Sequence, residues 1–133
     1  MRTGQCLCGS VRFRIDGELQ PFSYCHCESC RRSSGSAFMA NSDIRSSQLH
    51  WVQGRDCIRE YESSPGKFRA FCGGCGSPIY ARHPAQPEWL SMRLGLIEGD
   101  PGQRASAHFN VSEKAEWFTV SDGLPQYPGD SET

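Results

Sequence analysis

The sequence predicts a mainly β fold of short antiparallel strands with little helix. The 133-residue chain contains 14 Gly and 8 Pro, a composition that favours turns and short strands over long helices. Apolar residues recur at every second position in several short runs, as expected of strands that bury one face. The length suits one domain with a buried core, and no internal repeat or linker divides residues 1–133.

The first predicted strand covers residues 10–16, where apolar and polar residues alternate, and Gly17 ends it. Cys6 and Cys8 precede this strand. Because residues two apart in an extended chain share a face, both thiols are expected to point to the same side. The pair would therefore offer two ligands to one ion from a strand end.

Three further cysteines lie close together near the middle of the first half of the chain. Cys25 and Cys27 share a face by the same argument, with His26 directed the other way. Cys27 and Cys30 form a Cys-x-x-Cys step, which needs a tight turn or a first helical turn to bring both sulfurs to one ion.

The rest of the chain is predicted to form short strands joined by turns. A Ser-Ser-Pro-Gly turn signal at residues 63–66 predicts a hairpin that leads into a Cys-Gly-Gly-Cys motif. A short helical turn is expected over residues 112–117 with Ser112 as its cap, and the tail from about residue 124 is expected to be irregular. After a loop at residues 33–36, strands are predicted over residues 37–40, 48–52, 58–61, 67–71, 78–81, 89–97 and 107–111, with a helix as the alternative for 89–97.

Charge and hydropathy disfavour several classes of protein. The net charge is −1 and the pI is near 6.4, and the scattered Lys and Arg disfavour a broad nucleic-acid-binding surface. No apolar run is long enough to span a bilayer, and the first residues lack the apolar segment of a signal peptide. We therefore expect a soluble, cytoplasmic protein that binds neither nucleic acid nor membrane.

The eight cysteines indicate metal binding rather than disulfide bonds, because a reducing cytoplasm opposes disulfides and Cys-x-Cys pairs are poorly placed to bridge internally. Thiolate ligands favour zinc over magnesium or calcium, and iron is less expected in an all-thiolate site framed by glycines. A structural zinc site takes four protein ligands, whereas a catalytic site takes three and leaves one position open.

Seven of the cysteines fall into three clusters, and seven divides into four plus three. The predicted closed site joins Cys6, Cys8, Cys72 and Cys75, and the predicted open site uses Cys25, Cys27 and Cys30. A ribbon-like site made of Cys27, Cys30, Cys72 and Cys75 is also geometrically reasonable, but it leaves Cys6, Cys8 and Cys25 without a role. Cys57 lies outside the clusters and is expected to be a small buried hydrophobe on a strand.

Three motifs follow one another along the chain: Cys-x-Cys-Gly from Cys6, Cys-His-Cys-x-x-Cys-Arg from Cys25, and Phe-Cys-x-x-Cys-Gly from Phe71. Together with matching residues in segments 33–38 and 108–126, this order resembles the glutathione-dependent formaldehyde-activating enzyme family (GFA, or CENP-V/GFA, domain). The resemblance covers nearly the whole chain. It implies an Mss4-like β fold stapled by zinc and one GFA-type zinc-binding domain over residues 1–133.

The resemblance also implies a function. It places a structural zinc ion on the four-cysteine set and a catalytic zinc ion on the three-cysteine set, two per chain. It implies a carbon–sulfur lyase working in the synthetic direction, in which a thiol typified by glutathione adds to formaldehyde or a related small aldehyde to give S-(hydroxymethyl)glutathione. Arg31, next to Cys30, is a candidate to offset thiolate charge or to bind a substrate carboxylate.

His26 is a candidate proton donor, although a histidine between two ligands more often faces away and hydrogen-bonds the backbone. His50 and His108 are expected on strand surfaces, and the three tryptophans in the core or at a pocket rim. Two other functions stay open: a non-catalytic zinc module that binds a protein partner, and a thiol redox sensor. A fourth protein ligand at the cluster of Cys25, Cys27 and Cys30 would argue against the enzyme.

Overall fold

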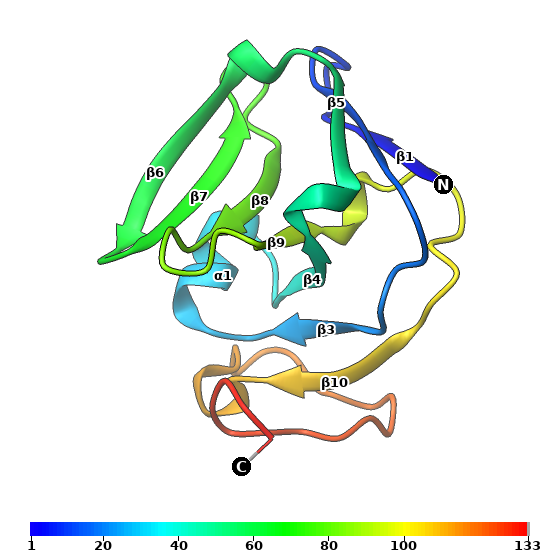
Figure 1. The fold of residues 1–133 in the computed structure, drawn as a ribbon. Coiled ribbons are helices and arrows are strands. Elements are labelled where there is room, and N and C mark those ends of the chain that lie inside the picture. The colour runs from blue at the N-terminus through cyan, green and yellow to red at the C-terminus, as the bar shows by residue number, and fades with distance from the viewer. Residues whose placement is uncertain (133) are drawn as a thin grey trace.

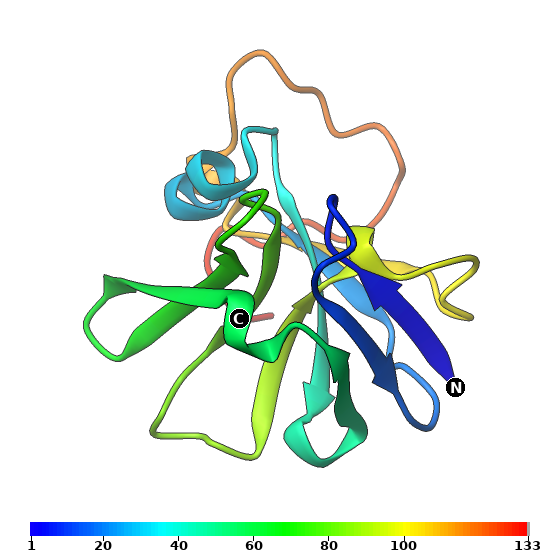
Figure 2. The same ribbon diagram turned by 90° about the horizontal axis from the view of Figure 1, so that it is seen from above.

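The computed structural model describes residues 1–132 and contains two β-sheets, with one α-helix among these residues. The smaller sheet has the strand order β1-β2-β5, and the larger has the order β10-β3-β4-β9-β8-β7-β6 (Figures 1 and 2). The predicted mainly β fold is therefore confirmed. The elements are β1 (Arg2–Gln5), β2 (Arg12–Ile15), β3 (Phe22–Cys25), α1 (Glu28–Ser34), β4 (Met39–Arg45), β5 (Leu49–Gln53), β6 (Ile58–Ser64), β7 (Lys67–Cys72), β8 (Pro78–Arg82), β9 (Trp89–Arg93) and β10 (Ala105–Phe109).

The core lies between the two sheets. Phe13 and Ile15 of β2 are buried and pack with Ile44, Ile79 and Met92 from β4, β8 and β9. The period-two alternation that predicted the first strand thus marks the face that is withdrawn from water. Burial of these side chains supplies the main favourable free energy that holds one sheet against the other.

The pairing of β3 with β10 is parallel, whereas the other named strand pairs are antiparallel. Parallel strands need a long connection, and here most of the chain lies between the two. The register places His108 opposite Tyr24 and Phe109 opposite Cys25. The end of β10 therefore lies directly beside the central cysteines.

The predicted hairpin is present as β6 and β7, with Gly66 at a φ of 78° in its turn. Several predicted elements differ from the structure. The strand expected over residues 89–97 ends at Arg93, because Leu94–Leu96 form a 3₁₀ turn closed by a 3.0 Å hydrogen bond from the Ile97 N–H to the Leu94 carbonyl. The loop expected at residues 33–36 begins later, because α1 continues through Ser34.

The short helical turn near the C-terminus also differs from the prediction. A 3₁₀ turn covers Val111–Glu113, and Asn110 stands at its N-cap position. Ser112 does not cap it, because its hydroxyl donates a 2.8 Å hydrogen bond to the Pro128 carbonyl. Cys57 likewise closes the 3₁₀ turn Arg55–Cys57 instead of lying on a strand, and its half-buried side chain packs against the core.

The chain after this turn passes close to α1 and returns beneath β10 (Figures 1 and 2). His108 makes two backbone hydrogen bonds of 2.9 Å with the tail: its N–H donates to the Pro125 carbonyl, and its carbonyl accepts from the Tyr127 N–H. The Asn110 N–H donates to the Gly129 carbonyl at 2.7 Å. The tail has little regular structure, yet these bonds hold it against β10.

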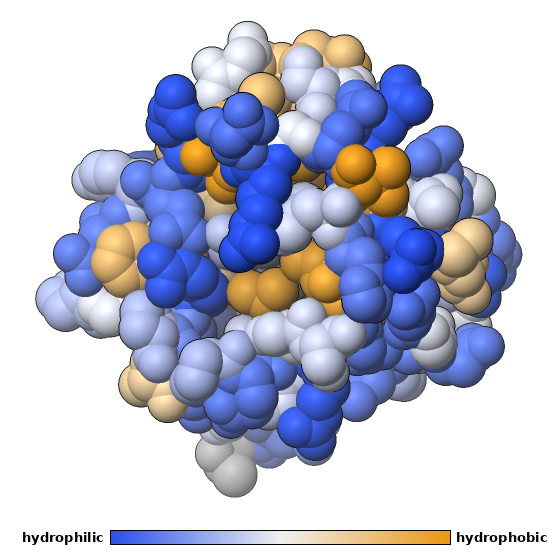
Figure 3. Space-filling model, turned by 45° about the horizontal axis from the view of Figure 1, so that its top comes forward, coloured by the Kyte–Doolittle hydropathy of each residue, from blue (hydrophilic) through white to orange (hydrophobic). Residues whose placement is uncertain are grey.

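The face shown in Figure 3 is mostly hydrophilic, and its apolar side chains form small groups separated by hydrophilic residues. Within residues 1–132, no helix has both the length and the apolar character needed to cross a membrane.

Candidate metal centres

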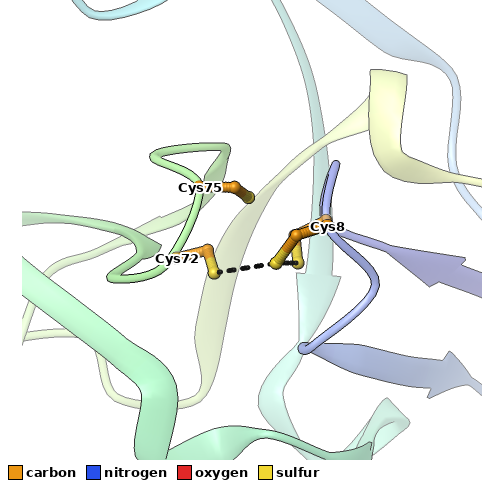
Figure 4. Close-up of side chains that lie close together, drawn as sticks. Cys8, Cys72 and Cys75 are labelled. Atoms are coloured by element: carbon orange, nitrogen blue, oxygen red, sulfur yellow. Dashed lines mark hydrogen bonds between the residues drawn. The ribbon is translucent and has the colours of Figure 1, made fainter.

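Four cysteine sulfurs meet where the β1–β2 loop approaches the turn after β7. Cys6 and Cys8 come from the first loop, and Cys72 and Cys75 come from the second, with all four Sγ atoms within 4.8 Å of one another. The labelled side chains in Figure 4 point toward a common centre from opposite sides. Cys8 Sγ lies 3.7 Å from Cys6 Sγ and 3.9 Å from Cys72 Sγ.

These separations fit one tetrahedral zinc ion. Bonds of about 2.3 Å to zinc place thiolate sulfurs about 3.8 Å apart in a tetrahedron, whereas a disulfide bond measures about 2.05 Å. Backbone N–H groups of Val11 and Gly74 also donate to Cys6 Sγ at 3.3 Å and to Cys72 Sγ at 3.4 Å. Such donors stabilise thiolates, which zinc requires. The donor set and its spacing therefore suit zinc.

The second cluster forms where β3 passes into α1. Cys25 ends β3, Cys27 is the N-cap of α1, and Cys30 lies in the first turn, where its N–H donates a 3.3 Å hydrogen bond to Cys27 Sγ. The expected first helical turn is thus present. Among residues 1–132, no fourth His, Cys, Asp or Glu joins these three thiols, so the set has the composition of an open zinc site.

Arginine and asparagine side chains surround this three-cysteine cluster. Both Nη atoms of the buried Arg69 approach Cys30 Sγ, at 3.7 and 3.8 Å, and the Asn110 amide donates to Cys25 Sγ at 3.2 Å. Hydrogen bonds with Cys25 and Cys27, helped by Arg69, lower the pKa of the Cys30 thiol to about 2. The pKa of Cys25 is raised, because its bonds with Cys27 and Cys30 keep its proton. These contacts therefore favour the thiolate form of Cys30.

A pocket of about 480 Å³ opens beside this cluster. Cys25 and Cys30 form part of its wall, and Trp89 also lines it. The other lining residues include groups of both charges and uncharged polar groups: Asn41, Asp43, Lys67, His83, Glu88 and Arg93. A small polar molecule could therefore reach the two thiols.

Arg31 does not line this pocket. Its side chain is half-buried, and its Nε atom is buried without a hydrogen-bond partner. The neighbouring Arg32 points outward, with a 2.5 Å ion pair to Glu28 one helical turn earlier. The guanidinium that contacts a ligand sulfur instead belongs to Arg69, far along the sequence.

His26 faces away from the pocket into an aromatic cluster. Its ring packs near Phe38 and Phe118, and its Nε2 lies 2.7 Å from Nδ1 of His108. His108 Nε2 in turn lies 2.8 Å from a carboxylate oxygen of Asp122. The side chain of His26 is therefore bonded to another side chain, whereas a backbone partner was expected.

The prediction that His108 lies on a strand surface is wrong, because only 1% of the residue is exposed. The parallel pairing of β10 with β3 and the tail beneath β10 cover it. His50 agrees with the prediction for it, with a partly exposed side chain on β5 that contacts Asp16 at 2.9 Å. Trp51 packs against the core, whereas Trp117 is 74% exposed and belongs to neither the core nor the pocket wall.

Sequence reasoning missed Arg69, Arg93 and Asn110. Both arginines occur in strands whose alternation gives the impression that charged residues face water. The face of the larger sheet that carries Arg69 is covered by α1, where Ser33 accepts a hydrogen bond from Arg69. Because α1 is distant in sequence from β7, no local pattern in the sequence predicts this burial. Asn110 has a left-handed backbone with a φ of 58°, which no sequence pattern announced.

A family model and one curated relative name the same family. The model of the family described as glutathione-dependent formaldehyde-activating enzyme matches residues 1–118. A putative glutathione-dependent formaldehyde-activating enzyme of Halomonas elongata is 29% identical over 125 residues, covering 88% of this chain and 79% of the relative. An uncharacterized lyase of Schizosaccharomyces pombe is 36% identical over 127 residues, covering 96% and 90%.

A solved structure supports the fold. The crystal structure of a Rhodobacter sphaeroides protein superposes with a TM-score of 0.63 at 20% identity, covering 94% of this chain and 98% of the other. At this identity the likeness concerns the fold alone.

Proposed function

Because the chain belongs to the glutathione-dependent formaldehyde-activating enzyme family, we propose that it adds a glutathione-like thiol to formaldehyde or a related small aldehyde. With glutathione the product is S-(hydroxymethyl)glutathione. One observation carries the proposal: the cluster of Cys25, Cys27 and Cys30 has three protein ligands and adjoins a pocket. A set closed by a fourth side chain would leave no position for a substrate thiol.

The two clusters have different proposed tasks. Cys6, Cys8, Cys72 and Cys75 hold a structural zinc ion that joins the first loop to the turn after β7 and thereby stabilises the fold. Cys25, Cys27 and Cys30 hold a second zinc ion with one position open. Bound there, zinc would supply the Lewis acidity that lowers the pKa of an incoming thiol.

The side chains around the open cluster position the reactants. Arg69 offsets the negative charge gathered on Cys30. Lys67 can bind a carboxylate of the thiol, and Asp43 can bind its ammonium group, because both line the pocket. Together these groups suit a small thiol that carries both charges.

Native mass spectrometry of the wild type and the variants Cys30→Ser and Cys57→Ser tests the assignment of the metals. We expect two zinc ions in the wild type and in Cys57→Ser, one in Cys30→Ser, and retention of glutathione only where two zinc ions remain. Cys57 is the matched control, because it lies outside both clusters. Equal metal content in all three proteins would contradict the split.

Activity needs a separate measurement, because glutathione and formaldehyde also combine spontaneously. Exchange NMR spectroscopy at equilibrium compares the interconversion of glutathione and its hydroxymethyl adduct with and without protein. We expect acceleration by the wild type and none by Cys30→Ser. A wild-type rate equal to the protein-free rate would refute the proposed function.

A further inference from the structure

Two buried arginines stand beside the open cluster without a carboxylate partner. Arg69 is 8% exposed and Arg93 is 5% exposed, and within residues 1–132 neither forms an ion pair with Asp or Glu. Burial of a guanidinium is costly unless an anion or hydrogen-bond acceptors compensate for the lost water. Each arginine therefore needs a compensating group.

The donors of Arg69 are already engaged. Its Nε donates to the Ser63 hydroxyl at 3.1 Å, its Nη1 donates to the Ser33 hydroxyl at 3.2 Å, and both Nη atoms approach Cys30 Sγ. Arg69 thus serves the cluster itself and has little capacity for a substrate.

Arg93 differs in having an unused donor. Its Nη1 donates a 2.6 Å hydrogen bond to the Asn41 side-chain oxygen, its Nε is buried without a partner, and no described residue accepts a hydrogen bond from its Nη2. Asn41 stands directly opposite Arg93 in the pairing of β4 with β9, so two strands hold the guanidinium in place. Such a fixed donor requires no reorganisation when charge develops near it.

Arg93 also faces the pocket beside the three-cysteine cluster. It lines the same cavity as Cys25 and Cys30. Burial lowers the pKa of Arg93 to about 10, while the nearby charge of Cys30 opposes this shift. The side chain therefore stays cationic at neutral pH and lies within electrostatic range of the thiols.

We propose that Arg93, oriented by Asn41, binds the oxygen atom that becomes negative when a thiol adds to an aldehyde in this pocket. This role rests on the proposed function. The thiol first loses its proton to solvent, and its sulfur then forms a bond to the aldehyde carbon. The π electrons of the carbonyl move to oxygen, giving an alkoxide that accepts a hydrogen bond from Arg93. Water returns a proton, and the sum is one thiol plus one aldehyde giving one hemithioacetal, which for formaldehyde is the S-hydroxymethyl adduct.

Other basic side chains are less suited to this task. Arg31 is outside the pocket wall, and His83 lines the pocket but is exposed to solvent. An exposed group is hydrated and mobile, so it stabilises a developing charge less than a buried, oriented one.

Exchange NMR on zinc-loaded wild type, Arg93→Gln and Arg93→Lys tests whether Arg93 accelerates the addition of the thiol to the aldehyde. We expect Arg93→Gln to lower the catalysed rate about 10²- to 10³-fold, as loss of one oriented donor does, and Arg93→Lys to restore part of it. The control is Arg104→Gln, because Arg104 is exposed and paired with Asp100; its rate should equal that of the wild type. A catalysed wild-type rate that Arg93→Gln retains would overturn the role of Arg93 and leave the proposed function intact, whereas no wild-type catalysis would refute the proposed function itself.

A binding measurement avoids dependence on turnover. Thioglycolate and 2-mercaptoacetamide have the same shape, but only the first places an anionic oxygen near the sulfur. By calorimetry the wild type should prefer thioglycolate at least about tenfold, and Arg93→Gln should reduce this preference to the share that Lys67 supplies. If circular dichroism shows that Arg93→Gln is unfolded, Asn41→Ala replaces it and should reduce the preference by releasing the guanidinium. An unchanged preference in the folded variant would overturn the proposal.

Discussion

Asn110 offers a sharp test of how the side chains around a cysteine control metal binding. Its amide donates to Cys25 Sγ at 3.2 Å, and it is the one non-glycine residue of the described chain with a positive φ. Asn110→Gly removes the amide without strain, because glycine adopts the left-handed backbone freely. Asn110→Ala removes the same amide and adds the strain.

The two variants should therefore separate metal affinity from folding stability. Loss of a hydrogen bond to a metal ligand weakens metal binding about 10- to 100-fold, so both variants should show this loss at the three-cysteine cluster. A left-handed alanine costs a further ~1–2 kcal/mol, so only Asn110→Ala should show this extra fall in the free energy of unfolding.

Competition with a zinc chelator, followed by native mass spectrometry, measures the affinity. The cluster of Cys6, Cys8, Cys72 and Cys75 lies elsewhere in the fold and serves as an internal reference. We expect the zinc ion at the three-cysteine cluster to leave both variants at a lower chelator concentration than in the wild type, and the ion at the four-cysteine cluster to leave at an unchanged concentration. Equal weakening of both ions, or no weakening, would refute the reasoning.

Two further predictions concern the scaffold. Gly54 and Gly35 both have positive φ. A Cβ on Gly54 would lie 1.9 Å from the Ser10 carbonyl oxygen, whereas a Cβ on Gly35 would have no atom within 4 Å. In urea unfolding, Gly35→Ala should therefore lower the free energy of unfolding by about 1 kcal/mol and Gly54→Ala by several kcal/mol. Equal losses would show that the structure relieves the clash at Gly54. Hydrogen bonds from Arg82 hold the pKa of Glu60 below its ordinary value of 4.5, so its contribution is present above pH 4.5 and is lost as the pH falls through the lowered pKa. Glu60→Gln should lower the free energy of unfolding by less than ~1 kcal/mol at pH 7, and the loss at pH 3 should be smaller than the loss at pH 7. A difference between wild type and variant that does not change with pH would contradict this.

The sequence predicted most of the strands and the two groups of cysteines. Alternation at residues 10–16 predicted β2, the Pro-Gly turn predicted the hairpin of β6 and β7, and the spacing of Cys27 and Cys30 predicted a first helical turn. These features depend on neighbours in the chain, where period and turn chemistry act directly. Counting cysteines also separated the groups of four and three that the structure brings together.

Only the tertiary structure decided what surrounds those ligands. Arg69 of β7 and Asn110 after β10 contact the three-cysteine cluster, and Arg93 of β9 lines the pocket beside it. His108 is buried because β10 pairs in parallel with a strand more than eighty residues earlier. These contacts join residues that are distant in sequence, and their energies depend on burial and direction, which local periodicity does not contain. The charges around the open cluster therefore arise from the packing of the sheet and not from the motif that supplies the thiols.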